Sequence, residues 1–149
     1  MKIFIDADGC PVIKPAEKIA EENKIFVEIF CDTSHEIHSD YAHVNTVSKG
    51  SDSVDFAIVN CISPGDILIT QDYGLAAMAI SKRARVITQN GLEISDENLQ
   101  NLLLSRHISK KERRAGNRIK GPKKRTQSQN SAFEIKLRET IKNENTCKS

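Results

Sequence analysis

Short runs of apolar residues alternate along the chain with longer stretches in which apolar residues recur every three or four positions. The short runs are rich in Ile and Val, which is typical of strands covered on both faces. The longer stretches show the period of amphipathic helices. Strands that alternate with helices predict a mainly parallel sheet between two helical layers. The expected strands cover residues 2–6, 26–31, 44–48, 67–70 and 85–88, and the expected helices cover residues 12–24, 54–62, 74–82, 95–107 and 132–141.

Two regions interrupt this alternation. Residues 32–43 fit neither period and stay unassigned. Residues 105–130 are polar, basic and rich in turn-forming residues, which favours a loop or an extended arm. The last expected helix places Phe133, Leu137 and Ile141 on one face, as an amphipathic helix does.

Charge divides the chain into two parts, although the net charge is only +2. Residues 1–104 contain 8 Lys and Arg against 16 Asp and Glu, a net of −8, whereas residues 105–149 contain 14 against 4, a net of +10. We therefore expect an α/β domain over residues 1–104 and a basic C-terminal extension with a final helix over residues 105–149. A basic extension suggests a nucleic-acid partner, and the alternative is ordinary solvated surface.

Composition narrows the class of protein further. No run of 18 apolar residues could span a membrane, and the N-terminus lacks the pattern of a secretory signal. The four cysteines, Cys10, Cys31, Cys61 and Cys147, are scattered and form no C-x-x-C pair, which argues against a structural zinc site or disulfides. We expect a cytoplasmic protein without a membrane partner, and the sequence leaves its oligomeric state open.

Acidic residues follow three of the expected strands. In open α/β sheets, ligands bind beyond the carboxyl ends of the strands. Two carboxylates about 4 Å apart repel by about 4 kcal/mol at an effective dielectric constant of 20, so a cluster needs protons or a cation. Oxygen ligands suit Mg²⁺ or Mn²⁺, which activate water for attack on a phosphodiester. The candidate metal ligands are Asp6 and Asp8 after the first strand, Asp52 and Asp55 after the third, and Asp72 after the fourth; the amides Gln89 and Asn90 follow the fifth.

Two of these aspartates also have a structural explanation. Asp55 and Asp72 stand at the expected starts of helices. An aspartate there can cap free backbone N–H groups and interact favourably with the helix dipole. Taken alone, each of these residues is more often a helix cap than a metal ligand, and it is the convergence of several at one edge that favours the metal.

Histidine and cysteine offer weaker candidates. His35, His38 and His43 lie in the unassigned region after Cys31, but their spacing fits no zinc pattern, so we interpret them as surface residues. His35 could still reach the acidic edge because it follows the end of the second strand. Cys10 has no basic neighbour in the sequence, which favours a buried packing residue over a nucleophile.

Several longer motifs carry a family resemblance. The segments "DADGCPV", "SDSVDFAIV", "GDILITQDYGLAAMAI" and "RRAGNRIKGPKK" resemble the YaiI/YqxD-like family of uncharacterised bacterial proteins over residues 1–137. That family is regarded as PIN-like. The resemblance implies a PIN-like three-layer α/β/α sandwich with a mainly parallel central sheet.

By similarity to PIN-type ribonucleases, the resemblance implies catalytic roles for Asp6, Asp55 and Asp72, with Asn90 near a more variable position. The chain departs from the family at two places. Gly9 stands where the family usually has Ala, and the stretch "QSQNSA" before Phe133 stands where the family tends to have an Asp-Arg pair.

These observations support three functional hypotheses. The first is a nuclease that depends on Mg²⁺ or Mn²⁺ and acts on RNA. The alternative is a non-catalytic module that binds RNA or a ribonucleoprotein, and a third hypothesis is a phosphatase for a small phosphorylated substrate. In the nuclease, the candidate phosphate-binding residues are Arg106, Arg113, Arg114, Lys120, Lys123, Lys124 and Arg125.

Overall fold

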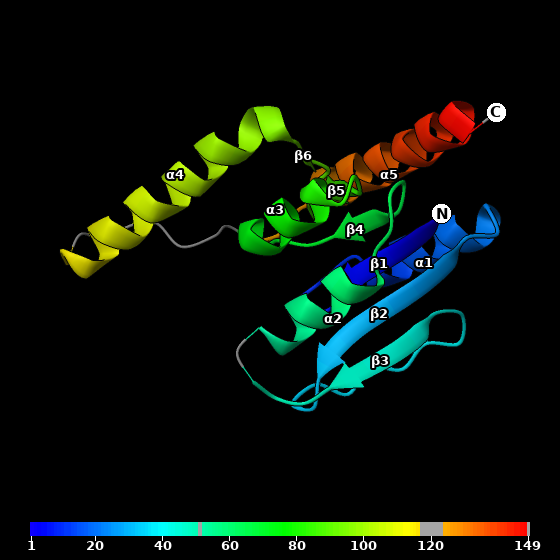
Figure 1. Ribbon diagram of the computed structural model, residues 1–149, viewed down its shortest axis with the longest axis horizontal. Coiled ribbons are helices and arrows are strands. Elements are labelled where there is room, and N and C mark those ends of the chain that lie inside the picture. Colours follow the sequence, from blue (N-terminus) through cyan, green and yellow to red (C-terminus); the bar gives the residue numbers. More distant parts are fainter. Residues whose placement is uncertain (51, 117–123, 149) are drawn as a thin grey trace.

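In the part of the chain that the structure describes, one six-stranded sheet forms the centre of the protein. The computed structural model describes residues 1–50, 52–116 and 124–148 (Figure 1). The strand order is β3-β2-β1-β4-β5-β6; the first five are parallel to their neighbours, and β6 is antiparallel to β5. The strands are β1 (Lys2–Asp6), β2 (Phe26–Asp32), β3 (His43–Val47), β4 (Ile67–Ile69), β5 (Arg85–Ile87) and β6 (Glu93–Ile94).

Helices cover both faces of this sheet, which confirms the predicted three-layer α/β/α arrangement. Side chains alternate between the faces with a period of two. Ile3 and Ile5 of β1 pack in the core formed with α1 and α5, whereas Phe4 lies in the core formed with α2, α3 and α4. The helices are α1 (Ile13–Glu22), α2 (Ser53–Cys61), α3 (Tyr73–Ser81), α4 (Asp96–Arg114) and α5 (Gln127–Lys148).

The C-terminal helix belongs to the core. Phe133 and Leu137 are fully buried and Ile141 is 2% exposed, which confirms the predicted face. The helix begins at Gln127, earlier than expected, because a capping box forms at its start. The backbone N–H of Gln129 donates to Oγ1 of Thr126 (3.3 Å), and the N–H of Thr126 donates to Oε1 of Gln129 (2.9 Å).

Helix α4 is longer than predicted and ends at Arg114 instead of His107. Apolar residues do not recur at helical intervals in its second half, but that half is rich in Lys and Arg, which have high helix propensity. The boundary expected between residues 104 and 105 therefore falls inside α4. It marks the position along the sequence at which the charge changes from acidic to basic. This half of α4 extends away from the sheet (Figure 1). No helix in the described part of the chain is long and apolar enough to cross a membrane.

Candidate active site

The order of the strands creates a crevice between β1 and β4. The chain order reverses there, since β2 and β3 lie on one side of β1 and β4 and β5 on the other. Ligands of open α/β sheets bind at such a point, beyond the carboxyl ends of the strands. A cavity of about 320 Å³ opens at this carboxyl edge. Its wall contains Asp6, Asp8, Asp32, Asp52, Asp55 and Asp72, together with Arg106, and we call it the acidic cavity.

Asp6 and Asp72 are linked by one hydroxyl group. Oγ1 of Thr70 donates to Oδ2 of Asp6 (2.8 Å) and accepts the backbone N–H of Asp72 (3.0 Å). Burial raises the pKa of Asp6, and the negative charges of Asp72 and Asp8 raise it further, while the Thr70 hydrogen bond acts in the opposite direction. The site therefore includes Thr70, a buried residue that the sequence did not single out.

Asp72 is the N-cap of α3, as the capping alternative predicted. Its Oδ1 accepts the backbone N–H groups of Gly74 (2.9 Å) and Leu75 (3.2 Å). Both bonds use the same oxygen, and Asp72 also lines the acidic cavity. Capping and a role in the site are compatible in this residue.

Asp55 lies in the first turn of α2, not at its cap. Its pKa is raised to about 6, first by burial and then by the negative charges of Asp72, Asp6 and Asp52. A hydrogen bond between the Asp55 and Asp72 side chains also favours the protonated form of Asp55. The structure thus brings all three predicted catalytic aspartates close enough to interact.

Asp52 occupies the N-cap of α2 in an unusual backbone conformation. Its φ of 64° is left-handed, and its side chain makes no capping hydrogen bond. For a residue other than glycine, this conformation costs about 1 kcal/mol or more. The carboxylate faces the acidic cavity without serving the helix, so its placement there is not explained by capping.

A histidine bridges two carboxylates at the rim of the acidic cavity. Nε2 of His35 lies 3.2 Å from Oδ1 of Asp8, and Nδ1 lies 3.2 Å from Oδ1 of Asp32. His38 pairs instead with the exposed Glu36. Asp32 was missed by the sequence analysis, although it ends β2 and so obeys the same rule as Asp6.

The arrangement does not contain a ready-made metal centre. Within the described residues, no group of three or more His, Cys, Asp or Glu side chains is placed to hold one ion. Mg²⁺, however, is commonly bound by one or two carboxylates, with water and substrate phosphate completing the shell. The contact between Asp55 and Asp72, next to Asp6, fits such a sparse site, and Asp8 and Asp52 lie on the same wall.

The candidate phosphate-binding residues fall into different environments. Arg106 lines the acidic cavity, and its guanidinium carbon lies 5.6 Å from the centre of the Tyr73 ring. Arg114 and Lys124 are exposed. Lys120, Lys123 and the side chain of Arg113 lie outside the described part of the structure.

The Arg125 side chain forms hydrogen bonds within the protein that stabilise the fold. Its Nη2 donates to the carbonyl of Gln89 (2.5 Å), Nη1 to Oδ1 of Asn90 (2.7 Å), and Nε to Oδ1 of Asn130 (2.5 Å). These bonds attach the loop after β5 to the start of α5. The loop approaches the helix so closely that a Cβ atom on Gly91 would lie 2.5 Å from the carbonyl oxygen of Ala132. Asn90 therefore serves this junction.

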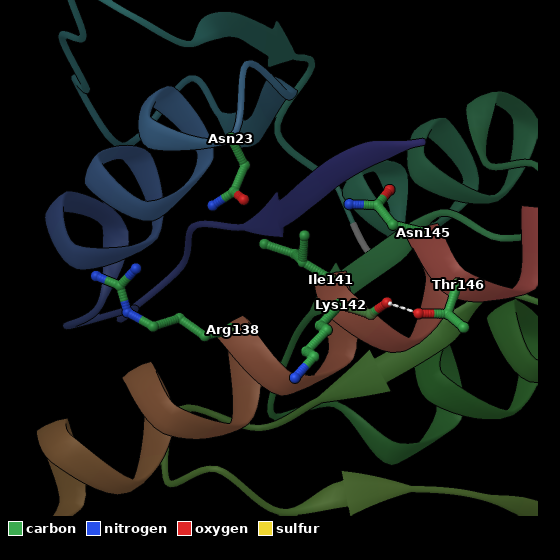
Figure 2. A pocket seen from close by; sticks show the side chains of 6 residues that line it. All are labelled: Asn23, Arg138, Ile141, Lys142, Asn145 and Thr146. Atoms are coloured by element: carbon green, nitrogen blue, oxygen red, sulfur yellow. Dashed lines mark hydrogen bonds between the residues drawn. The ribbon is translucent and has the colours of Figure 1, made fainter. Parts of the chain in front are cut away.

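A second and larger cavity lies elsewhere, between the end of α1 and the C-terminal half of α5. The cavity has a volume of about 480 Å³. Figure 2 shows the residues that line it, which include Asn23, Lys142 and Asn145. Arg138 at its rim is paired with Glu22 (2.7 Å). Among the described residues, those that line this cavity include no carboxylate. The acidic cavity is the better candidate for chemistry.

The fold and the site together define a class: an α/β protein of three layers with clustered carboxylates at the point where its strand order reverses. The sequence matches the family described as "Uncharacterized BCR, YaiI/YqxD family" over residues 4–143. The chain belongs to this family.

Curated relatives match along nearly their whole length. A UPF0178 protein of Clostridium acetobutylicum is 46% identical over 143 residues, which cover 95% of this chain and 97% of that protein. A UPF0178 protein of Exiguobacterium sibiricum is 48% identical over 134 residues, covering 90% and 92%. A third, from Lachnoclostridium phytofermentans, is 47% identical over 145 residues, covering 95% and 97%. No solved structure matches the chain.

The raised pKa of Asp55 predicts a dependence of stability on pH. Between about pH 4 and pH 6, the folded protein without metal holds a proton on Asp55 that the unfolded chain releases, so the free energy of unfolding falls as pH rises through this window. Asp55→Asn should therefore stabilise the metal-free protein near pH 7.5. Because Asp55 is partly exposed, we expect about 1 kcal/mol, or about 3 °C in melting temperature.

Thermal melts in a chelating buffer at about pH 4 and pH 7.5 test this expectation. The gain should be much smaller at the lower pH, because the folded protein keeps the proton on Asp55 there and the carboxyl of the unfolded chain is already partly protonated. Asp40→Asn, which removes an exposed carboxylate outside the acidic cavity, is the matched control and should give no gain at either pH. Equal gains for both variants would show that the effect is one of net charge alone.

Proposed function

We propose that the protein is a nuclease that uses Mg²⁺ or Mn²⁺ to hydrolyse phosphodiester bonds in single-stranded RNA. One observation carries this proposal: Asp6, Asp55 and Asp72 come from three separate segments and interact with one another in a single open cavity. Their mutual repulsion is costly without a cation, and their position is the one at which α/β sheets bind ligands.

Each side chain has a role in this proposal. Asp55 and Asp72 would hold the ion, with Asp8 and Asp52 as supporting ligands. When bound, Mg²⁺ or Mn²⁺ supplies Lewis-acid polarisation of the phosphodiester and a water of lowered pKa. Asp6, fixed by Thr70, would orient the attacking water and accept its proton, since burial makes its carboxylate a stronger base.

Arg106 would hold the phosphate next to the scissile one. It is the basic residue among those that line the acidic cavity, and its position over Tyr73 limits its freedom. Lys110 and Arg114 follow it at intervals of four residues and so lie along the same side of α4. A strand leaving the acidic cavity could follow this row of cations, which we call the basic row. RNA is favoured over a small phosphorylated substrate because the row extends beyond the cavity.

Incubation of the protein with end-labelled single-stranded RNA tests the activity directly. We expect cleavage with Mg²⁺ or Mn²⁺ and none with EDTA. Single-stranded DNA of the same sequence shows whether the sugar matters, and an activated aryl phosphate monoester tests the phosphatase hypothesis. RNA that is bound but not cut under any metal condition would favour the non-catalytic module instead.

The basic row also predicts a salt-dependent affinity. Each phosphate contact on a single strand contributes about 0.7 to the slope of log affinity against log salt. Replacing Arg106, Lys110 and Arg114 together with Ala should reduce that slope by about 2. Lys14→Ala, Lys18→Ala and Lys24→Ala combined remove the same charge from exposed positions of α1 and the turn after it, and should leave the slope unchanged. Equal losses in both triple variants would mean that RNA senses only the net charge.

A further inference from the structure

Helix α4 carries a second surface on the side opposite its basic row. Residues that recur every three or four positions share a side of a helix, which places Glu97, Asn101, Leu104, Ile108 and Lys111 in one line. All five are exposed; Leu104 is 56% and Ile108 is 47% exposed. We call this line the outer stripe. Leu104 and Ile108 are four residues apart, so their side chains are neighbours on this side of the helix. The half of α4 that follows Leu104 extends away from the sheet (Figure 1).

The charges of the outer stripe are complementary to those of a second copy that runs in the opposite direction. Glu97 precedes Leu104 by seven residues and Lys111 follows it by seven, so the two charges lie about 10 Å to either side of Leu104. In an antiparallel pair centred on Leu104, Glu97 of each copy would meet Lys111 of the other. Among the described residues, neither charge has an ion-pair partner within its own chain.

We propose that the protein forms a twofold-symmetric dimer through the outer stripe, with the α4 helices antiparallel and Leu104 on the axis. Such an interface is isologous, as is usual for homodimers. Ile108 of each copy would lie against the helix turn before Leu104 of the other, which removes both aliphatic side chains from water. The contact is limited to one helix from each copy, so we expect a weak dimer that depends on protein concentration.

A second copy fits this surface better than nucleic acid does. The outer stripe contains one carboxylate, two aliphatic side chains and one cation, whereas phosphate contacts need several cations. Arg106 and Lys110 lie on the opposite side of the helix and stay free in the dimer. The proposed contact therefore does not compete with the proposed function and does not depend on it.

Sedimentation of the full chain without RNA, under reducing conditions, tests the dimer. The weight-average mass should rise with concentration toward twice 16.6 kDa. Leu104→Glu places two negative charges on the axis and should leave a monomer at every concentration. Ile135→Glu is the matched control, because Ile135 is a 66% exposed aliphatic residue on α5, and it should dimerise normally.

Charge exchange tests the register. Glu97→Lys should weaken the dimer about tenfold, since it creates two like-charge contacts. Combining it with Lys111→Glu should restore the original affinity. In a background of Cys61→Ser and Cys147→Ser, Leu104→Cys should form a covalent dimer on oxidation and Ile135→Cys should not.

Three outcomes would overturn the proposal. The first is a wild-type chain that stays monomeric at the highest concentration, and the second is a dimer that survives Leu104→Glu. The third is a monomer whose RNA affinity falls in Leu104→Glu but not in Ile135→Glu, which would assign the outer stripe to nucleic acid.

Discussion

Asp72→Asn is expected to lower the hydrolysis of single-stranded RNA by about 100- to 1,000-fold while leaving the protein folded, a loss typical of removing one stabilising group from an active site. Asn is as good an N-cap as Asp, so the hydrogen bonds to Gly74 and Leu75 can be kept. The substitution removes the negative charge from the acidic cavity and little else. The rate of cleavage under saturating metal measures the effect.

The controls separate chemistry from folding. Asp40→Asn should cleave RNA at the wild-type rate. In chelating buffer, Asp72→Asn should melt at a higher temperature than the wild type, because it relieves repulsion with Asp55 and Asp6. Full activity in Asp72→Asn would remove the acidic cavity from the proposed mechanism, and a lower melting temperature would mean that its capping role dominates.

The second large effect concerns the metal itself. A ligand present at 100 times its dissociation constant stabilises a folded protein by about 2.7 kcal/mol, which corresponds to roughly 5–10 °C in melting temperature for a chain of this size. We expect Mn²⁺ to raise the melting temperature by this amount at pH 7.5. At pH 5 the rise should be smaller, because Asp55 is then largely protonated.

Asp55→Asn should lose most of the stabilisation by Mn²⁺, and Asp40→Asn should keep it. These melts need neither RNA nor catalysis, so they test metal binding independently of hydrolysis. If millimolar Mn²⁺ does not change the melting temperature of the wild type, the proposed cofactor is wrong even if the protein binds RNA.

The layered fold and most of the wall of the acidic cavity could be predicted from sequence because both follow from local rules. The interval at which apolar residues recur identifies strands and helices, and the carboxyl ends of parallel strands meet at one edge of the sheet. That rule located Asp6 and Asp72. Applied to the second strand as well, it would have included Asp32, which was left in an unassigned region.

Other features depend on contacts between distant residues and could not be predicted. Arg125 resembled the lysines and arginines around it, yet its partners Gln89 and Asn90 lie about 35 positions earlier in the chain. Thr70 ends a predicted strand, and its importance comes from a hydroxyl that reaches Asp6. Neither contact leaves a periodic signal in the sequence.

The Thr70 bridge also makes the site depend on strand register. β1 and β4 pair with Ile5 opposite Ile69, which sets Asp6 beside Thr70. A slip of one residue in either strand would turn its side chains to the other face and separate Asp6 from the hydroxyl, while leaving the sheet compact and hydrogen-bonded. Circular dichroism would not distinguish such a misaligned molecule from the native one. The rate of the proposed RNA cleavage would, so during refolding it would measure the fraction of molecules in which the central strands have reached their correct alignment.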